Sequence, residues 1–344
     1  MGFINSPNGA ATFFKTLYDN KKKFEKGGNE VKFYCQPLNF NLHSEDNVKS
    51  LPNKKASRLR AILLISAKYS TILAVLLFKK FALSHAKRVI NSISNVNKND
   101  KWIFNDIFVA YYFMRKFNNT DNMFLILHNN GDPSKMFYET FPKLKHKFVS
   151  RIIEKKVRET IVKANHIIVL ADNAKNALSL KYPQIYNLDL KCTVIGNGIE
   201  LPIVKKSRKR INKKIGISVG SISYRKGFDL LVEANNRLDN DSEIELWCVG
   251  NIQDKKILKM NKSKGNIKFL GPKNRLELIQ LLAESDFFIL CSRDEGMPIS
   301  IIEAMQYSLP IFATDVGAIN TMVDSNQNGF LINPNSDSIF ILSK

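Results

Sequence analysis

A short polar stretch that follows an apolar segment has the residue types of a ligand site. It runs from Ser292 to Ala304 (SRDEGMPISIIEA), directly after the apolar FFILC. Proline suits the first position of a helix because it lacks the N–H that would be unpaired there, so we expect a helix to begin at Pro298. The next amides, at Ile299, Ser300 and Ile301, would then point out of the helix start, where they can bind a phosphate.

Two carboxylates in this stretch restrict the ligand that fits. Glu295 lies in the loop before the helix, where it would repel a bare anion. A ligand with both a phosphate and neutral hydroxyls resolves the conflict, because Glu295 can accept hydrogen bonds from sugar hydroxyls. Glu303, eight positions further on, could accept from a second diol such as a ribose. The alternative is that Glu295 only favours the helix dipole and Glu303 is a solvated surface residue. Spacing alone leaves both interpretations open.

Two adjacent cations occur where another apolar segment runs into a helical pattern. Arg225 and Lys226 lie in the sequence GSISYRKG, from Gly220 to Gly227. They could clamp a diphosphate and neutralise its charge as it leaves. A solvated charged turn is the alternative.

The elements around both stretches alternate regularly, which predicts a doubly wound α/β domain. The polar and basic stretch from Leu201 to Lys214 marks the boundary, so we expect domains at 1–200 and 201–344. Ligands in such sheets bind at the carboxyl ends of the strands. The expected strands are 215–220, 244–250, 267–271, 287–291, 310–314 and 329–332, with helices that begin near Lys226, Asp254, Asn274, Pro298 and Ala318.

The N-terminal part predicts a second parallel sheet, opened by a βαβ unit. The apolar stretch from Ala61 to Phe78 is 18 residues long, on the margin for a membrane span. Lys68 near its middle would cost roughly 2.5–3.5 kcal/mol at the bilayer centre, so we expect a core helix or a helix on the membrane surface. The expected strands are 2–5, 31–35, 106–110, 124–127, 166–170 and 193–195, with helices at 10–26, within 56–98 and at 147–164.

Composition indicates a folded protein with an anionic partner. Among 344 residues, 52 Lys and Arg against 31 Asp and Glu give a net charge of +21, of which residues 1–200 carry +17. Such a surplus favours a phosphate-rich substrate, an acidic membrane surface or nucleic acid, and we find no nucleic-acid-binding motif. A generally basic proteome is the alternative explanation of the charge. The four cysteines form no CxxC pair, which indicates a reducing compartment. Residues 1–10 have neither a basic nor an apolar region, so we expect no signal peptide.

Together the motifs resemble the retaining glycosyltransferases of family 4, the group 1 type. Their E-x7-E element corresponds to EGMPISIIEA, from Glu295 to Ala304. GGNEV (27–31), VIGNGIE (194–200), FLG (269–271) and ATDVG (313–317) are similar to further family elements in the same order. The resemblance implies the GT-B fold, an α/β architecture of two facing Rossmann-like, doubly wound domains with a cleft between them.

The resemblance also implies a role for each site residue. Glu295 would contact the donor sugar, Glu303 the nucleotide ribose, and Arg225 with Lys226 the diphosphate. Gly9 matches a glycine-rich turn that faces the phosphates, and His128 a histidine beside the reacting sugar. A capping or core histidine is an equal interpretation of His128. The loop and helix start would assist donor binding through Gly296, Met297, Pro298, Ile299 and Ser300.

The family resemblance implies a retaining, metal-independent transfer. The oxocarbenium-like transition state leaves charge on the diphosphate, which the two cations and the helix start would stabilise. We therefore expect no cofactor and no metal, and we discount Asp239-Asn240-Asp241 as a metal motif because it lies in a polar loop before a strand.

We expect a cytoplasmic enzyme, peripheral on the inner face of the cell membrane. It would move a sugar from a nucleotide-sugar donor to a glycan or lipid-linked acceptor in polysaccharide or lipopolysaccharide synthesis. The alternative is a truncated, inactive homologue that acts as a membrane-associated scaffold, because family members continue through further helices beyond the position of Lys344. An epimerase or phosphorylase would share the two-domain fold, but the E-x7-E element favours transfer.

Overall fold

The computed structural model forms two compact units. Unit 1 contains Tyr18–Val169 and Lys175–Ile195, and unit 2 contains Leu170–Ala174 and Gly196–Lys344. The structure describes residues 16–25, 30–34, 63, 66–118, 121–199, 213–238, 243–262, 266–335 and 337.

Unit 1 is built on a parallel sheet in the order β1-β2-β3-β4. The strands are β1 (Trp102–Phe104), β2 (Met123–Leu127), β3 (His166–Val169) and β4 (Cys192–Val194). Four of the five β2 residues are buried, as expected for a strand that is covered on both faces. The strands expected at 124–127, 166–170 and 193–195 are therefore confirmed.

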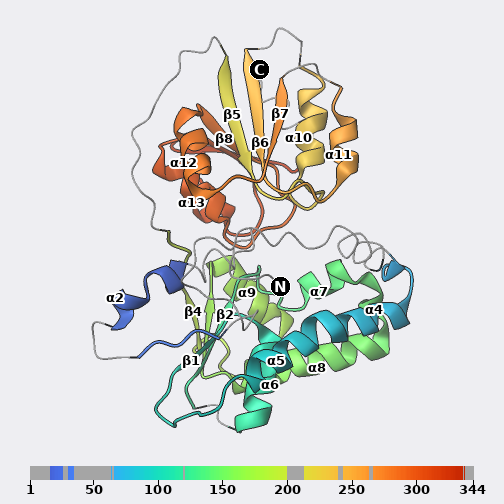
Figure 1. Ribbon diagram of the computed structural model, residues 1–344, viewed down its shortest axis with the longest axis vertical. Coiled ribbons are helices and arrows are strands. Elements are labelled where there is room, and N and C mark those ends of the chain that lie inside the picture. Colours follow the sequence, from blue (N-terminus) through green and yellow to red (C-terminus); the bar gives the residue numbers. More distant parts are fainter. Residues whose placement is uncertain are drawn as a thin grey trace. The chain divides into compact units, whose positions relative to one another are not determined.

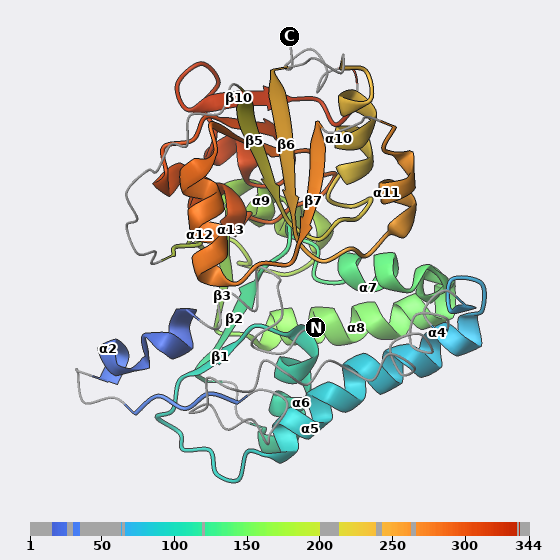
Figure 2. The same cartoon turned by 45° about the horizontal axis from the view of Figure 1, so that its top comes forward.

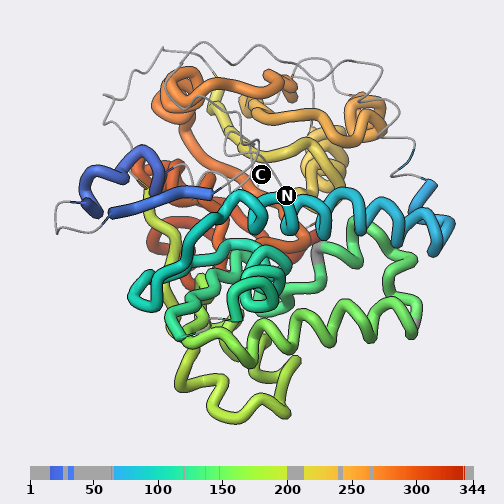
Figure 3. Tube along the Cα trace, turned by 60° about the horizontal axis from the view of Figure 1, so that its bottom comes forward, coloured from blue at the N-terminus to red at the C-terminus, as the bar shows by residue number. Residues whose placement is uncertain are grey.

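The described helices of this unit lie before, between and after these strands. They are α2 (Lys21–Glu25), α4 (Thr71–Phe78), the π-helix η2 (Lys79–Leu83), α5 (Ser84–Asn91), α6 (Ile107–Phe117), α7 (Lys135–Thr140), the 3₁₀ turn η3 (Pro142–Lys145), α8 (Lys147–Lys163) and α9 (Asp172–Lys181). In this unit α6 packs against both α5 and α8. Figure 3 traces α4, η2 and α5 as one cyan helical run.

The apolar stretch from Ala61 to Phe78 is not a single helix, so this expectation is wrong. Its described residues Ala67–Tyr69 form a turn, and Ser70 caps a new helix by accepting a hydrogen bond from the Leu73 amide at 3.3 Å. This helix continues past Phe78 to Asn91. Within the described ranges, no helix combines the length and apolar character that crossing a bilayer requires.

The strand expected at 106–110 is also wrong, because these residues begin helix α6. Asp106 caps the helix, and its Oδ1 accepts hydrogen bonds from the amides of Phe108 at 2.8 Å and Val109 at 3.1 Å. A capped N-terminus outweighs the strand preference of the residues Ile-Phe-Val.

The strand expected at 31–35 is likewise not observed over its described residues, Val31–Tyr34. The Val31 amide donates to Glu25 Oε1 at 3.4 Å rather than to a neighbouring strand. The strand expected at 2–5 lies outside the described residues.

Unit 2 contains a six-stranded parallel sheet in the order β10-β9-β8-β5-β6-β7. The strands are β5 (Lys214–Val219), β6 (Ile244–Val249), β7 (Ile267–Gly271), β8 (Phe287–Leu290), β9 (Ile311–Thr314) and β10 (Gly329–Ile332). All six expected strands are confirmed. The order reverses between β5 and β8, as in a doubly wound sheet.

Helices cover both faces of this sheet. They are α10 (Phe228–Asn235), α11 (Lys255–Met260), α12 (Arg275–Glu284), α13 (Ile299–Gln306) and the 3₁₀ turn η4 (Ile319–Thr321). Figures 1 and 2 show α10 and α11 on one face and α12 and α13 on the other, in agreement with two separate apolar clusters.

Three cysteines lie in these cores as unpaired thiols. Cys192 belongs to unit 1, and Cys248 and Cys291 belong to unit 2. Burial raises the pKa of each of the three thiols, so they stay protonated at neutral pH.

Candidate functional site

The switch point of the unit 2 sheet brings the two chemistry-bearing loops together. One loop follows β5 and contains Arg225 and Lys226, and the other follows β8 and contains Glu295. Because β5 and β8 are neighbouring parallel strands, both loops leave the same edge of the sheet. Ligands of doubly wound sheets bind at this position.

Lys226 and Glu295 form a buried ion pair between the two loops. Lys226 Nζ lies 2.5 Å from Glu295 Oε1, and Ser292 Oγ donates to the same oxygen at 2.5 Å. Glu295 is only 6% exposed. The Ser292 carbonyl in turn accepts a hydrogen bond from Thr314 Oγ1 at 2.5 Å. The acidic and basic groups expected from the sequence therefore meet in one place.

A second set of contacts fastens the outer parts of the same loops. The exposed Arg225 donates from its guanidinium to the Asp294 carbonyl at 3.0 Å. Arg293 binds both carboxylate oxygens of Asp229 at 2.7 Å, and its guanidinium stacks on the Tyr224 ring at 3.7 Å from the centroid. A bidentate pair of this kind fixes geometry as well as energy.

Glycines let the backbones of these loops approach closely. Gly227 has φ +66°, and a Cβ at this position would lie 1.8 Å from the Cys291 carbonyl oxygen. Gly317 has φ +61°, and its Cβ would lie 2.0 Å from the Glu295 carbonyl oxygen. A side chain fits at neither position, so the two glycines set the spacing of the loops.

Helix α13 begins one residue later than expected. Pro298 is the N-cap with φ −72° and ψ 116°, and the helix starts at Ile299. The Ile301 amide donates to the Pro298 carbonyl at 3.2 Å, so its expected outward direction is wrong. The amides of Ile299 and Ser300 have no acceptor within the helix, and they form the helix start that can meet an anion.

Asn197, from the motif VIGNGIE, contacts the same loop within unit 2. Asn197 Nδ2 donates to the Met297 carbonyl at 2.9 Å. A Cβ at Gly196 would lie 3.1 Å from the Met297 Cε and Sδ atoms. Asn197 therefore supports the residue that directly precedes the helix cap.

Glu303 is buried on α13 and is not a solvated surface residue, so that alternative is excluded. The residue is 6% exposed, and its Oε1 pairs with the guanidinium of Arg275, the first residue of α12. Burial raises the pKa of Glu303, and the positive charge of Arg275 opposes that rise.

His128 lies in unit 1, directly after β2. Its Nε2 is 3.2 Å from Asn105 Oδ1, and burial lowers the pKa of the imidazole to about 4. The ring is therefore neutral near pH 7. The neighbouring Asn129 has a buried Oδ1 without a hydrogen-bond partner among the described residues.

A polar network fixes the loop that follows His128. Asp132 accepts hydrogen bonds from the Ser134 amide at 3.0 Å and from the Lys135 amide at 3.1 Å, and it pairs with Lys181. The Ser134 hydroxyl bridges Asp132 at 2.8 Å and Glu154 at 2.6 Å. These bonds hold the start of α7 and so anchor the far end of the loop.

Most of the predicted site residues thus lie along one edge of one sheet. Unit 2 brings together Arg225, Lys226, Glu295, Gly296, Met297, Pro298, Ile299, Ser300 and Glu303. His128 belongs to unit 1, while Gly9 and the Asp239-Asn240-Asp241 segment lie outside the described residues.

Four residues that support the site were not predicted from the sequence: Arg275, Arg293, Ser292 and Asn197. The pairing of Arg275 with Glu303 and of Arg293 with Asp229 spans tens of residues and depends on the packing of separate elements. Ser292 and Asn197 lie within the recognised motifs, and their position was the available signal.

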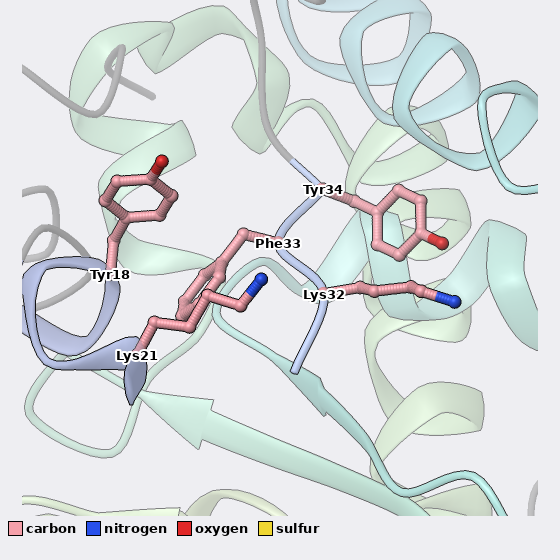
Figure 4. Close-up of a pocket in the computed structure, with 5 residues that line it drawn as sticks. All are labelled: Tyr18, Lys21, Lys32, Phe33 and Tyr34. Atoms are coloured by element: carbon pink, nitrogen blue, oxygen red, sulfur yellow. The ribbon is translucent and has the colours of Figure 1, made fainter. Parts of the chain in front are cut away.

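One shallow pocket lies in unit 1, away from these loops in the sequence. It has a volume of about 330 Å³ and is lined by Tyr18, Lys21, Lys32, Phe33 and Tyr34 (Figure 4). Its lysines pair with glutamates, Lys21 with Glu25 at 3.3 Å and Lys32 with Glu30 at 3.1 Å. Within the described part of the chain, no group of three or more His, Cys, Asp or Glu side chains could hold a metal ion.

Comparison with known proteins supports the resemblance. Residues 201–340 match the family model "Glycosyl transferases group 1". The chain is 29% identical over 179 residues to the UDP-Gal:alpha-D-GlcNAc-diphosphoundecaprenol alpha-1,3-galactosyltransferase of Escherichia coli, covering 46% of this chain and 45% of that protein. It is 28% identical over 193 residues to the capsular polysaccharide biosynthesis glycosyltransferase CapH of Staphylococcus aureus, covering 53% and 50%. The chain therefore spans about half the length of the curated relatives it matches.

The fold expectation is confirmed by solved structures. Anabaena HepE, solved in complex with UDP, superposes with a TM-score of 0.58 at 17% identity, covering 76% of this chain and 71% of that one. The chain has the mixed α/β fold of the GT-B glycosyltransferases, with parallel sheets in two domains.

Proposed function

Because residues 201–340 match the group 1 glycosyltransferases, we propose that this protein transfers a sugar from a nucleotide-sugar donor to an acceptor hydroxyl. The observation that carries the proposal is the contact between Lys226 and Glu295 at the switch point. It places a cation that suits a diphosphate beside a carboxylate that suits sugar hydroxyls. A nucleotide-sugar has both groups on adjacent atoms.

Lys226, Arg225 and the start of α13 stabilise the leaving diphosphate in this proposal. As the bond to the anomeric carbon breaks, negative charge grows on the phosphate oxygens. Lys226 shifts from its pairing with Glu295 toward that charge, while the amides of Ile299 and Ser300 donate from the helix start. Glu295 then accepts from the hydroxyls of the donor sugar.

The ribose and the reacting sugar use two further residues. Glu303 accepts hydrogen bonds from the ribose hydroxyls, and its burial strengthens those bonds by excluding water. His128, neutral because its pKa is low, hydrogen-bonds the reacting sugar without adding a positive charge. Gly9 keeps the phosphate-facing role that the family resemblance implies.

We further propose that the reaction retains the anomeric configuration and proceeds without a bound metal or cofactor. The two cations and the helix start supply the positive charge that a metal would otherwise bring to the diphosphate. Turnover that is unchanged by EDTA supports this part of the proposal, and a product with inverted configuration in its NMR coupling constants contradicts it.

The acceptor is proposed to be a glycan or lipid-linked sugar at an anionic membrane surface. The E. coli relative is named for a diphosphoundecaprenol acceptor and the S. aureus relative for capsular polysaccharide. In this chain, residues 47–99 contain 11 Lys and Arg and no Asp or Glu. On α4 in this stretch, Ile72 is 76% exposed and Leu76 is 56% exposed, so apolar and cationic groups are both available to a lipid surface. The protein would act in the cytoplasm, peripherally on the inner face of the membrane.

Thermal unfolding with UDP-, GDP-, ADP- and CMP-sugars tests donor binding. A ligand at a hundred times its Kd stabilises the folded protein by about 2.7 kcal/mol, which raises Tm measurably. Lys226→Met is expected to remove the Tm increase. Lys255→Met, which changes an exposed lysine at the start of α11, is the matched control and keeps it. A folded protein whose Tm no sugar nucleotide raises contradicts the proposal and favours the scaffold alternative.

A further inference from the structure

Arg275 is the partner of Glu303, and nothing in the recognised motifs gives it a role. It is the first residue of α12 and lies inside the capping box, between Asn274 and Glu277, which exchange hydrogen bonds. The cap fixes the backbone from which the side chain reaches Glu303 Oε1 on α13. The Arg275 side chain is 40% exposed, whereas that of Glu303 is 8% exposed. One end of the pair is therefore anchored in the core and the other faces solvent.

Arg275 is the one charged group that acts on Glu303 among the described residues. Burial raises the pKa of Glu303, and Arg275 opposes this through its charge and its hydrogen bond. The strands β8 and β9, which pack against α13, have no charged side chains, and Glu303 is the only charged residue of α13 itself. On α12, Glu277 is bound within the capping box and Glu284 lies at the opposite end of the helix. In the loop before α13, Glu295 is paired with Lys226.

We propose that Arg275 is a positioning residue of the donor site, which orients the Glu303 carboxylate toward the ribose hydroxyls of the nucleotide. This inference rests on the proposed function. Arg275 donates to Oε1, and a carboxylate has about four acceptor positions. The remaining positions accept from the 2′ and 3′ hydroxyls. Arg275 itself does not contact the nucleotide.

Binding of ribonucleotides and dideoxynucleotides to variants tests this role. Calorimetric titration compares UDP, GDP and ADP with their 2′,3′-dideoxy forms, whose sugar offers no hydroxyls to Glu303. Arg275→Met is expected to weaken the ribonucleotide that binds wild type by about tenfold to a hundredfold, the range for a hydrogen bond to a charged group. It should leave the affinity for the dideoxy form nearly unchanged. Arg275→Lys is expected to recover part of the loss, because lysine keeps the charge but not the planar guanidinium.

The pH profile separates positioning from a merely structural role. Without Arg275, burial raises the pKa of Glu303 further, so more of the carboxyl is protonated at the acidic end of the range. As the solution is acidified, Arg275→Met should therefore lose its ribonucleotide affinity at a higher pH than wild type does. Lys273→Met is the matched control, because Lys273 lies two residues before Arg275 but pairs with Glu277 at 3.5 Å. It should behave as wild type.

Two outcomes overturn the inference and are distinguishable from each other. If Arg275→Met loses the same affinity for the ribose and dideoxy forms, Arg275 acts elsewhere on the nucleotide, and the proposed function stands. If folded wild-type protein binds none of the nucleotides, the proposed function fails and the inference fails with it. Circular dichroism confirms folding, and Arg275→Lys supplies the comparison if the Met variant does not fold.

Discussion

Arg225 and Lys226 are neighbours in the sequence, but their surroundings differ. Lys226 is partly buried against Glu295, whereas Arg225 is exposed and donates to the backbone carbonyl of Asp294. Charge on the surface contributes little to stability, while one partner of a buried pair is costly to remove. The two cations therefore share a proposed ligand, the diphosphate, but they contribute differently to the stability of the folded protein.

Lys226→Met is expected to destabilise the protein by about 3–5 kcal/mol, because it leaves the Glu295 carboxylate buried without its cation. Arg225→Met should change stability by no more than about 0.5 kcal/mol. Urea unfolding in a Trp102→Phe background, where the fluorescence comes from Trp247 of unit 2, measures both. Combining Lys226→Met with Glu295→Gln should restore part of the loss. Equal losses of stability for Lys226→Met and Arg225→Met would contradict the conclusion that only Lys226 belongs to a buried ion pair.

His128 predicts a pH dependence of stability in the acidic range. Its folded pKa of about 4 lies below the usual 6.5, so folding favours the neutral ring. The neutral ring of His128 therefore contributes to the free energy of unfolding above pH 6.5, and this contribution is lost as pH falls from 6.5 toward 4. It amounts to about 3 kcal/mol at most. The difference in stability between wild type and His128→Gln should shrink over this range, and a constant difference would show that the ring titrates normally.

At the element scale, the sequence predicted unit 2 better than unit 1. Each strand of unit 2 is a short apolar segment bounded by glycine or polar residues, and strands alternate with helical patterns, so periodicity decides the assignment. In unit 1, the run after Asp106 has strand-forming residues but is a helix, because the aspartate caps it. The N-terminal cap outweighs the strand propensity of the residues that follow it. The strand of this region is β1, which ends at Phe104, before the cap.

The candidate site was predictable where it is local in the sequence. Glu295 and Glu303 share a loop and the helix that follows it, and their spacing is read directly from the chain. The partner of Glu303 was not predictable, because Arg275 reaches it from another helix through the packing of α12 beside α13. Whether a carboxylate is buried also depends on such packing, which explains why Glu303 could be read as a surface residue.

Two glycines with similar dihedral angles test how closely the elements approach. Gly227 and Gly271 have φ +66° and +69°, but a Cβ meets the Cys291 carbonyl at 1.8 Å in the first case and nothing within 4 Å in the second. Gly271→Ala should cost about 1–2 kcal/mol from the left-handed backbone alone. Gly227→Ala should cost more than twice as much, because the β5 and β8 loops must separate. Urea midpoints measure the difference, and similar midpoints would contradict the close approach.

At the scale of the whole molecule, positive charge is concentrated before residue 200. Residues 1–200 hold +17 of the net +21. A charge distribution of this kind attracts anionic surfaces over a distance of about the Debye length, and the attraction weakens as salt increases. In the described part of this region, α4 adds exposed apolar side chains that salt does not affect.

Flotation with liposomes tests both contributions. The protein should float with vesicles that contain phosphatidylglycerol at low salt, and most of it should be released at 0.5 M NaCl. Ile72→Ser with Leu76→Ser should weaken flotation at every salt concentration, since these side chains are exposed and leave the core intact. Tyr186→Ser with Leu190→Ser, which removes exposed apolar side chains from another segment of unit 1, is the matched control. Protein that stays in solution at low salt would contradict the membrane part of the proposal.

The buried thiols allow the opening rate of each unit to be measured separately. An alkylating reagent reacts with the thiolate, so Cys192, Cys248 and Cys291 are protected until the core around them opens. Peptide mass spectrometry after timed exposure to iodoacetamide should give one common rate for Cys248 and Cys291, and a separate rate for Cys192. A bound nucleotide should slow the first rate and leave the second unchanged. Distinct rates for Cys248 and Cys291 would mean that unit 2 opens in parts. Sugar-nucleotide binding could then be detected from the native cysteines of the chain itself, with no acceptor and no turnover.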